Sequence, residues 1–272
     1  MIQLTTDLVK WTMKPIAIVS ALHDELSKVL ALMPDEHRQT RGSREFWLGH
    51  LHGQAVVVVL SGIGKVAAAT TASLLIEHFG VSHIVFTGVA GALNYAVKVG
   101  DIVVASCFMQ HDMDASPLFP RYEIPGYGMA LFNADGNLSH ELADAGKEVL
   151  GQLHNVVKAD VIEAFGLESP QLHQGLIVSG DRFVSTALES RQIQQDLPQA
   201  LAVEMEGAAF AQVCHDFGVP FAAVRTISDR ADDDGTVDFT RFLADVASHY
   251  SANIMDNWLR KRSAIHRINT AP

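Results

Sequence analysis

Three acidic residues stand where apolar segments of this sequence end. Glu25 comes shortly after the first apolar run of the chain, and Glu206 and Asp229 come shortly after two later runs. Burial at such positions shifts the pKa of a carboxyl group. A carboxyl group whose pKa is shifted toward neutrality can donate or accept a proton in a reaction. The sequence therefore predicts acid and base chemistry at these three residues.

The elements that must position these residues alternate along the chain. Short apolar runs predict buried strands at 15–19, 54–60, 83–86, 101–105, 175–178, 201–203 and 221–224. Apolar periodicity predicts helices over 65–79, over 209–217 and from 238 to about 262. This alternation predicts an α/β protein with a central mixed sheet flanked by helices on both faces. Ligands bind beyond the carboxyl ends of strands in such sheets, where the three acidic residues fall.

Length and composition favour one domain. The chain has 272 residues, 48% of them hydrophobic, so a core of useful size can be buried within a single domain over 1–272. Residues 1–14 are expected to be an N-terminal extension and residues 263–272 a C-terminal tail. Two stretches, 110–131 and 159–174, interrupt the alternation and are expected to be surface excursions.

Charge and cysteine usage exclude several classes of function. The 20 Lys and Arg against 31 Asp and Glu give a formal charge of -11, which disfavours binding to nucleic acid. The two cysteines, Cys107 and Cys214, form no paired motif, which favours a reducing, cytosolic location. No run of about 18 apolar residues predicts a membrane span, and residues 1–14 do not have the pattern of a signal peptide.

Two other possible motifs lack a residue or a spacing that their function requires. The segment Ser61-Gly-Ile-Gly-Lys65 is similar to a phosphate-binding loop, but Val66 replaces the required hydroxyl residue. His50, His52 and the cluster at 111–114 offer metal-ligand types, but no histidine pair has the spacing of a known zinc motif. Neither ATP binding at 61–65 nor a metal site is expected.

Six blocks of sequence, in order, resemble the nucleoside phosphorylase superfamily, and within it the bacterial 5′-methylthioadenosine/S-adenosylhomocysteine nucleosidases. They are 61–69 (SGIGKVAAA), 87–91 (TGVAG), 99–104 (VGDIVV), 175–181 (GLIVSGD), 202–206 (AVEME) and 225–229 (RTISD). The resemblance extends over roughly 15–255 and implies the fold of that superfamily, a three-layer α/β sandwich. It implies hydrolysis of the bond between adenine and a 5′-thio-substituted ribose, through a transition state with oxocarbenium character.

The resemblance gives each acidic residue a role. Asp229 matches the acid that protonates N7 of the leaving adenine, which needs a raised pKa that a buried strand end beside Ser228 could provide. Glu25 matches the base that activates water on the opposite face of the sugar, as in inverting glycosidases. Glu206 matches the carboxylate that binds the ribose hydroxyl groups and stabilises positive charge in the ring.

The same resemblance implies a set of binding residues. Phe183 would stack on adenine, the main chain of Val184 would read its edge, and Met205 would lie under the ribose. Arg225 would hold the water or the carboxylates, and Gly88 and Gly91 would let the backbone approach the sugar. No metal or organic cofactor is implied. The family is usually dimeric, with a loop of one subunit closing the other's pocket, and the residues at the comparable positions are Phe119, Tyr122 and Pro125.

Departures from the family pattern leave the substrate open. Val89 stands where a small hydroxyl residue is common, and Leu22 replaces a frequent methionine. The regions that differ shape the 5′ side of the pocket, so the preferred 5′ group is not predicted. One alternative is a phosphate-dependent nucleoside phosphorylase, although the acidic loop at 23–25 disfavours a phosphate dianion. Another is a non-catalytic nucleoside-binding protein, which would be expected to lack one of the three carboxylates.

Overall fold

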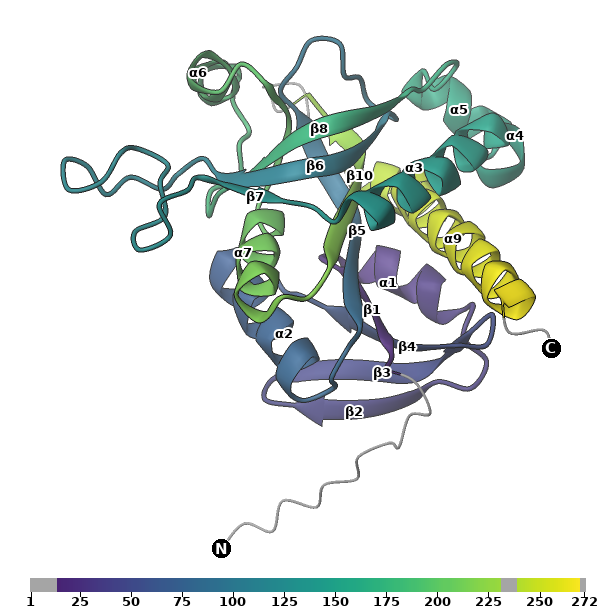
Figure 1. Cartoon of the computed structure of the whole chain (residues 1–272). Helices are drawn as coiled ribbons and strands as arrows, with labels where there is room; N and C mark the ends of the chain where they lie inside the picture. Colours follow the sequence, from purple (N-terminus) through teal and green to yellow (C-terminus); the bar gives the residue numbers. More distant parts are fainter. Residues whose placement is uncertain (1–13, 231–238, 270–272) are drawn as a thin grey trace, which may run out of the picture.

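The structure is a computed structural model that describes residues 14–230 and 239–269, with the side chains of 265–269 excepted (Figure 1). The predicted N-terminal extension therefore lies outside the described residues apart from Lys14, as do the last three residues of the predicted tail. Within the described ranges the chain builds a ten-stranded mixed sheet. Its strands are β1 (Ile16–Ser20), β2 (His37–Arg41), β3 (Arg44–Leu51), β4 (Gln54–Leu60), β5 (His83–Ala92), β6 (Ile102–Gln110), β7 (Leu131–Asn133), β8 (Leu172–Ser179), β9 (Ala200–Glu204) and β10 (Phe221–Asp229).

Helices cover both faces of this sheet, as the sequence predicted. They are α1 (His23–Leu30), α2 (Lys65–Glu77), α3 (Gly136–Gly151), α4 (Leu153–Val156), α5 (Ala159–Phe165), α6 (Ala187–Asp196), α7 (Gly207–Phe217), α8 (Phe239–Phe242) and α9 (Ser248–Asn269), with a π-helical turn (Leu243–Ala247) between the last two. In Figure 1, α2 and α7 lie on one side of the strands and α1, α3 and α9 on the other. The predicted α/β sandwich is confirmed.

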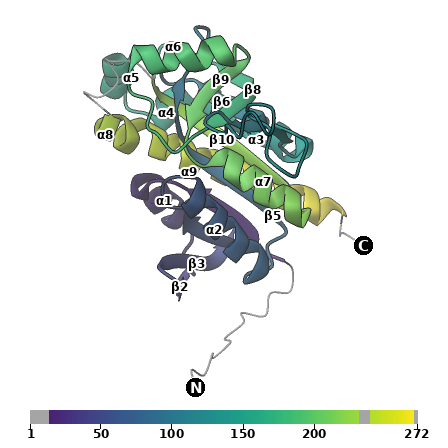
Figure 2. The same cartoon turned by 90° about the vertical axis from the view of Figure 1, so that its left-hand side faces the viewer.

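Two apolar cores hold these layers together. One packs α1, α3, α5 and α9 against the sheet and contains the fully buried Trp258 and Tyr250. The other packs the small residues of α2 and α7 against the opposite face, with Phe86 and Phe210 in edge contact at 4.9 Å between ring centroids. A smaller cluster seats α6 on β8 and β9 (Figure 2). The central strands β1 and β5, and most of β4, are buried between the two cores, which explains their nearly continuous apolar sequence.

The pairing of five strands closes on itself and brings their ends together. The circuit runs β5, β10, β6, β8, β9 and back to β5, while β1, β4, β3 and β2 extend the sheet from the other edge of β5. Gly91 of β5 pairs with Val203 of β9 on one side and with Asp229 of β10 on the other. The ends of three strands therefore meet at one point, where the predicted acidic residues lie.

Several predicted boundaries were wrong. The stretch 159–174 is not a surface excursion, because α5 buries Val161 and Ile162 in the core and β8 begins at Leu172. The last helix does not end near Arg262 but continues to Asn269, so most of the predicted tail is helical. The segment 111–131 does lie mostly exposed and projects from the body of the molecule at the left of Figure 1.

Candidate functional site

A pocket with about 610 Å³ of open space lies at the meeting point of β5, β9 and β10. Its walls include eight of the residues that the sequence singled out: Val89, Gly91, Phe183, Val184, Met205, Glu206, Ser228 and Asp229. Phe183 is 57% exposed, so one aromatic face is available to a ligand. The pocket therefore gathers two of the three predicted carboxylates and the predicted aromatic residue around one space.

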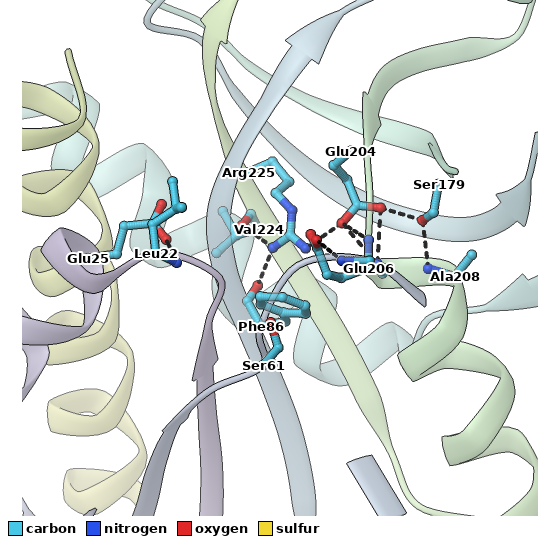
Figure 3. Close-up of polar contacts among 12 residues, drawn as sticks. Leu22, Glu25, Ser61, Phe86, Ser179, Glu204, Glu206, Ala208, Val224 and Arg225 are labelled. Atoms are coloured by element: carbon cyan, nitrogen blue, oxygen red, sulfur yellow. Dashed lines mark hydrogen bonds and ion pairs between the residues drawn. The ribbon is translucent and has the colours of Figure 1, made fainter. Parts of the chain in front are cut away.

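A buried ion pair supports the floor of this pocket. Arg225 Nη2 donates to Glu204 Oε2 at 2.7 Å, and the two side chains are 1% and 3% exposed. Glu204 also accepts hydrogen bonds from Ser179 Oγ, from the Glu206 amide at 3.2 Å and from the Gly207 amide at 2.9 Å (Figure 3). Glu204 therefore holds the two amides that flank the α-carbon of Glu206, and this fixes the position of the Glu206 carboxylate.

Arg225 links this network to the third predicted carboxylate. Its guanidinium lies over the ring of Phe86, 4.0 Å from the centroid, and Nη1 donates to the Phe86 carbonyl oxygen at 3.3 Å. Figure 3 shows Arg225 between Glu25 and Glu204. A Cβ atom placed on Gly88 would lie 3.3 Å from Arg225 Nη1 and 3.7 Å from Glu25 Oε1. A glycine at this position therefore allows the guanidinium and the Glu25 carboxyl group to approach the same strand.

Glu25 is completely buried in the first turn of α1. Its Oε2 accepts a weak hydrogen bond from the Leu22 amide at 3.4 Å, whereas its Oε1 has no hydrogen-bond partner among the described residues. Burial raises the pKa of Glu25 to about 8, although the positive charge of Arg225 opposes this shift. Leu22 lines the pocket, so Glu25 lies directly behind its wall with one free acceptor oxygen. This is a carboxyl group that can exchange a proton near neutral pH.

Glu206 and Asp229 have different surroundings within the pocket. Glu206 Oε1 accepts a hydrogen bond from the Gly64 amide at 2.9 Å. Burial, and after it the negative charge of Glu204, raises the pKa of Glu206 above its ordinary value. Asp229 Oδ2 accepts a hydrogen bond from Ser228 Oγ at 2.7 Å, and the side chain is buried at the end of β10. Two carboxyl groups with different environments therefore line the pocket, and the third lies behind its wall, an arrangement that acid and base catalysis can use.

Comparison with known proteins identifies the family. Residues 15–260 match the phosphorylase superfamily. A 5′-methylthioadenosine/S-adenosylhomocysteine nucleosidase of Shewanella loihica is 36% identical over 247 residues, which are 90% of this chain and 98% of the relative. The chain belongs to the nucleosidase branch of the phosphorylase superfamily. The resemblance predicted from the six sequence blocks is thereby confirmed.

Solved structures of this nucleosidase branch share the fold. The Neisseria meningitidis 5′-methylthioadenosine/S-adenosylhomocysteine nucleosidase in complex with methylthio-immucillin-A matches with a TM-score of 0.78 at 32% identity, covering 92% of this chain and 100% of that one. The Helicobacter pylori futalosine hydrolase matches with a TM-score of 0.77 at 32% identity, covering 91% and 98%. These proteins act on or bind small nucleosides or their analogues, as their names state.

Some residues predicted from the nucleosidase pattern do not line this pocket. Arg225 and Gly88 lie behind its floor, within the network around Glu204. Phe119, Tyr122 and Pro125 lie on the projecting segment 111–131 and are not among the described pocket residues. Tyr122 is turned instead toward α6, where its hydroxyl group donates to Asp196 Oδ2 at 3.4 Å.

Sequence reasoning missed several residues of the nucleosidase site. Glu204 was passed over because it stands in the same block as Glu206, yet it is the partner that neutralises Arg225. Ile63 and Phe239 line the pocket from segments far apart in the chain, and neither stands out by type or spacing. The signal that could have revealed Glu204 is a second acidic residue in an otherwise apolar strand, because a buried charge requires a partner.

Two further observations bear on cofactors and membranes. Among the described residues no group of three or more His, Cys, Asp or Glu side chains is placed to hold a metal ion. In the same part of the chain no helix combines the length and the apolar character needed to cross a membrane.

Proposed function

We propose that the protein hydrolyses the N-glycosidic bond of 5′-methylthioadenosine, S-adenosylhomocysteine or a related 5′-substituted adenosine and releases adenine. The observation that carries this proposal is the placement of three carboxyl groups around one pocket. Glu206 and Asp229 line it, and Glu25 lies buried behind Leu22 with a free acceptor oxygen. A glycosidic bond is broken in this way when one group protonates the leaving base and another activates water.

Asp229 serves as the acid at the leaving group. Adenine is a poor anionic leaving group, so a proton must reach N7 as the bond lengthens. Asp229 lies in the pocket wall at the end of β10, where its carboxyl group can transfer a proton to the base, and Ser228 Oγ donates to Asp229 Oδ2 and orients it. Phe183 stacks on the base and the main chain of Val184 meets its edge, since both lie on the same wall of the pocket.

Glu25 and Glu206 act on the sugar. Glu25 accepts a proton from a water molecule that attacks the carbon as positive charge develops, and Arg225 limits the rise of its pKa so that a useful fraction is ionised. Glu206 accepts hydrogen bonds from the ribose hydroxyl groups, and its negative charge stabilises the oxocarbenium-like transition state. Met205 lies beside the ribose and Gly91 permits close approach of the backbone.

The apolar end of the pocket suits a thioether. Leu22, Ile63 and Phe239 line it and offer no hydrogen-bond donor to a 5′-hydroxyl group. Val89 adds a further apolar surface at a position where the nucleosidase family commonly has a small hydroxyl residue. A sulfur-linked substituent is weakly hydrated and loses little by leaving water, so 5′-thio substrates are preferred over adenosine itself.

Charge argues against phosphate as the nucleophile. Glu204, Glu206 and Asp229 line the pocket, whereas Arg182 is the single cationic side chain among its described lining residues. A phosphate dianion needs several convergent cations. Adenine release should therefore proceed at full rate in phosphate-free buffer, with 5-methylthioribose as the second product. Strict dependence on phosphate, or formation of a sugar 1-phosphate, would overturn the proposal.

The test is a panel of substrates in that buffer. It includes 5′-methylthioadenosine, S-adenosylhomocysteine, adenosine and futalosine, the last because one structural relative is named a futalosine hydrolase. Release of the base from any 5′-substituted adenosine by the parent, and its loss in Glu206→Gln, supports hydrolysis at this site. Tight binding of a nucleoside with no turnover by the parent would favour the non-catalytic alternative.

The active form is proposed to be a homodimer that binds no nucleic acid or membrane. Ile63 of the pocket wall is 62% exposed, Val66 in the first turn of α2 is 79% exposed and Leu118 on the projecting segment is 84% exposed, and an interface with a second subunit would bury such apolar side chains. Phe119, Tyr122 and Pro125 on the projecting segment would close the pocket of the partner subunit. Light scattering that gives twice the chain mass supports this arrangement, and an active monomer contradicts it. The cytosolic location inferred from the cysteines stays a prediction.

A further inference from the structure

The connection between β4 and α2 reaches the pocket through a main-chain amide. The Gly64 amide donates to Glu206 Oε1 at 2.9 Å, and the next amide, that of Lys65, donates to Asp181 Oδ1 at 2.7 Å. Gly64 is the N-cap residue of α2 and provides no capping side chain. Two carboxylates from other parts of the sheet therefore occupy the positively polarised end of this helix. The orientation of Glu206 depends on where the first turn of α2 lies.

A partly exposed salt bridge holds that turn in place. Lys65 Nζ lies 2.6 Å from Asp112 Oδ1, and Asp112 Oδ2 accepts a hydrogen bond from the Asp181 amide at 2.9 Å. Lys65 is 17% exposed and Asp112 29%, so solvent screens this pair less than a surface pair. Asp112 follows β6, Asp181 follows β8 and Lys65 follows β4. The three residues, here called the Asp112 bridge, thus tie three strand ends together.

The backbone at Gly64 leaves little freedom for another arrangement. Its φ is +90°, and a Cβ atom there would lie 3.0 Å from Asp181 Oδ1. Only glycine lets the Asp181 carboxylate reach the Lys65 amide while the Gly64 amide points at Glu206. The hydrogen bond to Glu206 and the Asp112 bridge are therefore parts of one connected structure.

We propose that Asp112 is a positioning residue for Glu206, which it controls through Lys65, Asp181 and the Gly64 amide. Asp112 does not line the pocket and touches no reacting atom. Its effect on catalysis rests on the proposed function, whereas its effect on the Gly64 amide does not. Removing its charge leaves Lys65 with only the longer ion pair to Asp181 Oδ2, at 3.9 Å. This change loosens the first turn of α2 and weakens the hydrogen bond that Glu206 receives.

The weaker hydrogen bond has a consequence that depends on pH. The Gly64 amide stabilises the ionised form of Glu206 and so lowers its pKa, against the larger upward effect of burial. The other charged groups that act on Glu206 are Glu204 of β9, Arg225 of β10 and Glu25 of α1. Asp181 lies at the same end of α2, where it accepts from the Lys65 amide and donates its own amide to Asp112. When the amide moves away, the pKa of Glu206 rises, and a higher pH is needed to ionise the carboxylate that binds the ribose.

The test compares Asp112→Asn with Asp114→Asn in the full chain. Asparagine keeps an acceptor oxygen for the Asp181 amide but removes the charge that pairs with Lys65. We expect kcat/KM for 5′-methylthioadenosine at pH 7 to fall roughly tenfold, as for loss of a charge-assisted contact, and its acidic limb to move to higher pH. Asp114 Oδ1 accepts hydrogen bonds from Ser116, and Asp114 Oδ2 lies 4.0 Å from Arg121 Nε. Neither contact involves Lys65, so Asp114→Asn should keep the kcat/KM and the acidic limb of the parent.

Amide exchange provides a readout that needs no activity. Peptides that span 61–66 should exchange several-fold faster in Asp112→Asn, and equally in Lys65→Gln, which breaks the same salt bridge from its other end. If the parent releases no base, the proposed function has failed, but the exchange result still decides the role of Asp112. Unchanged exchange and an unchanged acidic limb in both variants would overturn the inference, and so would a lower unfolding temperature without either change.

Discussion

Arg225 and Glu204 form an ion pair at 2.7 Å in which both side chains are almost completely buried. Removing two charges from water is costly, and such a pair often contributes little net stability. Here each partner also acts on another group: Glu204 accepts from the amides of Glu206 and Gly207, and the positive charge of Arg225 opposes the rise in the pKa of Glu25. The pair is therefore best explained as a rigid connection between the carboxylate that faces the sugar and the one that lies behind the pocket wall.

Glu204→Gln should lower stability and shift the pH profile of catalysis. Glutamine keeps the shape and an acceptor oxygen but leaves the buried guanidinium uncompensated, so we expect a loss of about 3 kcal/mol in the free energy of unfolding. Loss of the negative charge also lowers the pKa of Glu206, because Glu204 is the second cause of its rise. Chemical denaturation and the pH profile of kcat/KM measure the two effects, and the acidic limb should move to lower pH.

The matched control is the exposed pair of Arg38 and Glu45, with 2.9 Å between its charged atoms. Glu45→Gln should change stability by less than about 1 kcal/mol, because solvent screens this pair. Equal losses in Glu204→Gln and Glu45→Gln would contradict the role assigned to burial.

The sequence predicted the strands that are uniformly apolar and misjudged those that carry paired polar residues. The bounds 54–60 agree with β4, whereas β10 continues five residues beyond Val224 through Arg225 and Asp229. Hydropathy places such residues in loops, because the partner that makes burial of Arg225 tolerable lies on another strand. The hairpin of β2 and β3 was missed although Gly42, with φ of +59°, marks its turn.

The same physics limits prediction of the site. Glu206 and Asp229 could be brought together in advance, because both follow strands whose ends must meet at one edge. Glu25 could be placed only near them, since its helix and its complete burial depend on packing between α1 and α9. Positions on the segment 111–131 that would face a partner subunit depend on contacts outside the single chain, so the sequence pattern does not locate them. The predicted role of Phe119 in closing the pocket of a partner subunit accordingly stays a prediction.

Glu25→Gln should stabilise the protein while it abolishes turnover. A carboxyl group whose folded pKa is raised to about 8 from an ordinary 4.5 binds a proton more tightly in the folded state. The stability of the parent therefore falls as pH rises from about 4.5 to 8, and the glutamine variant escapes this fall. We expect it to be more stable by about 4 kcal/mol at pH 8 and equal to the parent at pH 4.

Thermal unfolding over this pH range measures the difference, with Asp24→Asn as the control in the same helix. Asp24 is exposed, so its variant should keep the pH dependence of the parent. If the Glu25→Gln variant is no more stable than the parent at pH 8, the pKa of Glu25 in the folded protein is not raised.

Phe183→Ala should weaken binding of the base more than it slows the chemical step. The ring is half exposed on the pocket wall, and stacking of a base on an aromatic side chain contributes roughly 1–3 kcal/mol. We expect KM to rise about tenfold or more with a smaller change in kcat. Phe217, 46% exposed at the end of α7 and outside the described pocket lining, provides the control. A similar KM in Phe183→Ala and the parent would remove Phe183 from the binding site.

Asp229→Asn separates protonation of the leaving group from binding of the substrate. Asparagine keeps an acceptor for Ser228 Oγ but cannot release a proton, so kcat should fall about 10²- to 10⁴-fold while the dissociation constant for 5′-methylthioadenosine changes little. A 4-nitrophenyl 5-thioriboside distinguishes this from a general distortion of the pocket, because nitrophenolate leaves without a proton. The variant should cleave that substrate at nearly the parent rate. Equal losses on both substrates would mean that Asp229 positions the sugar rather than protonating adenine.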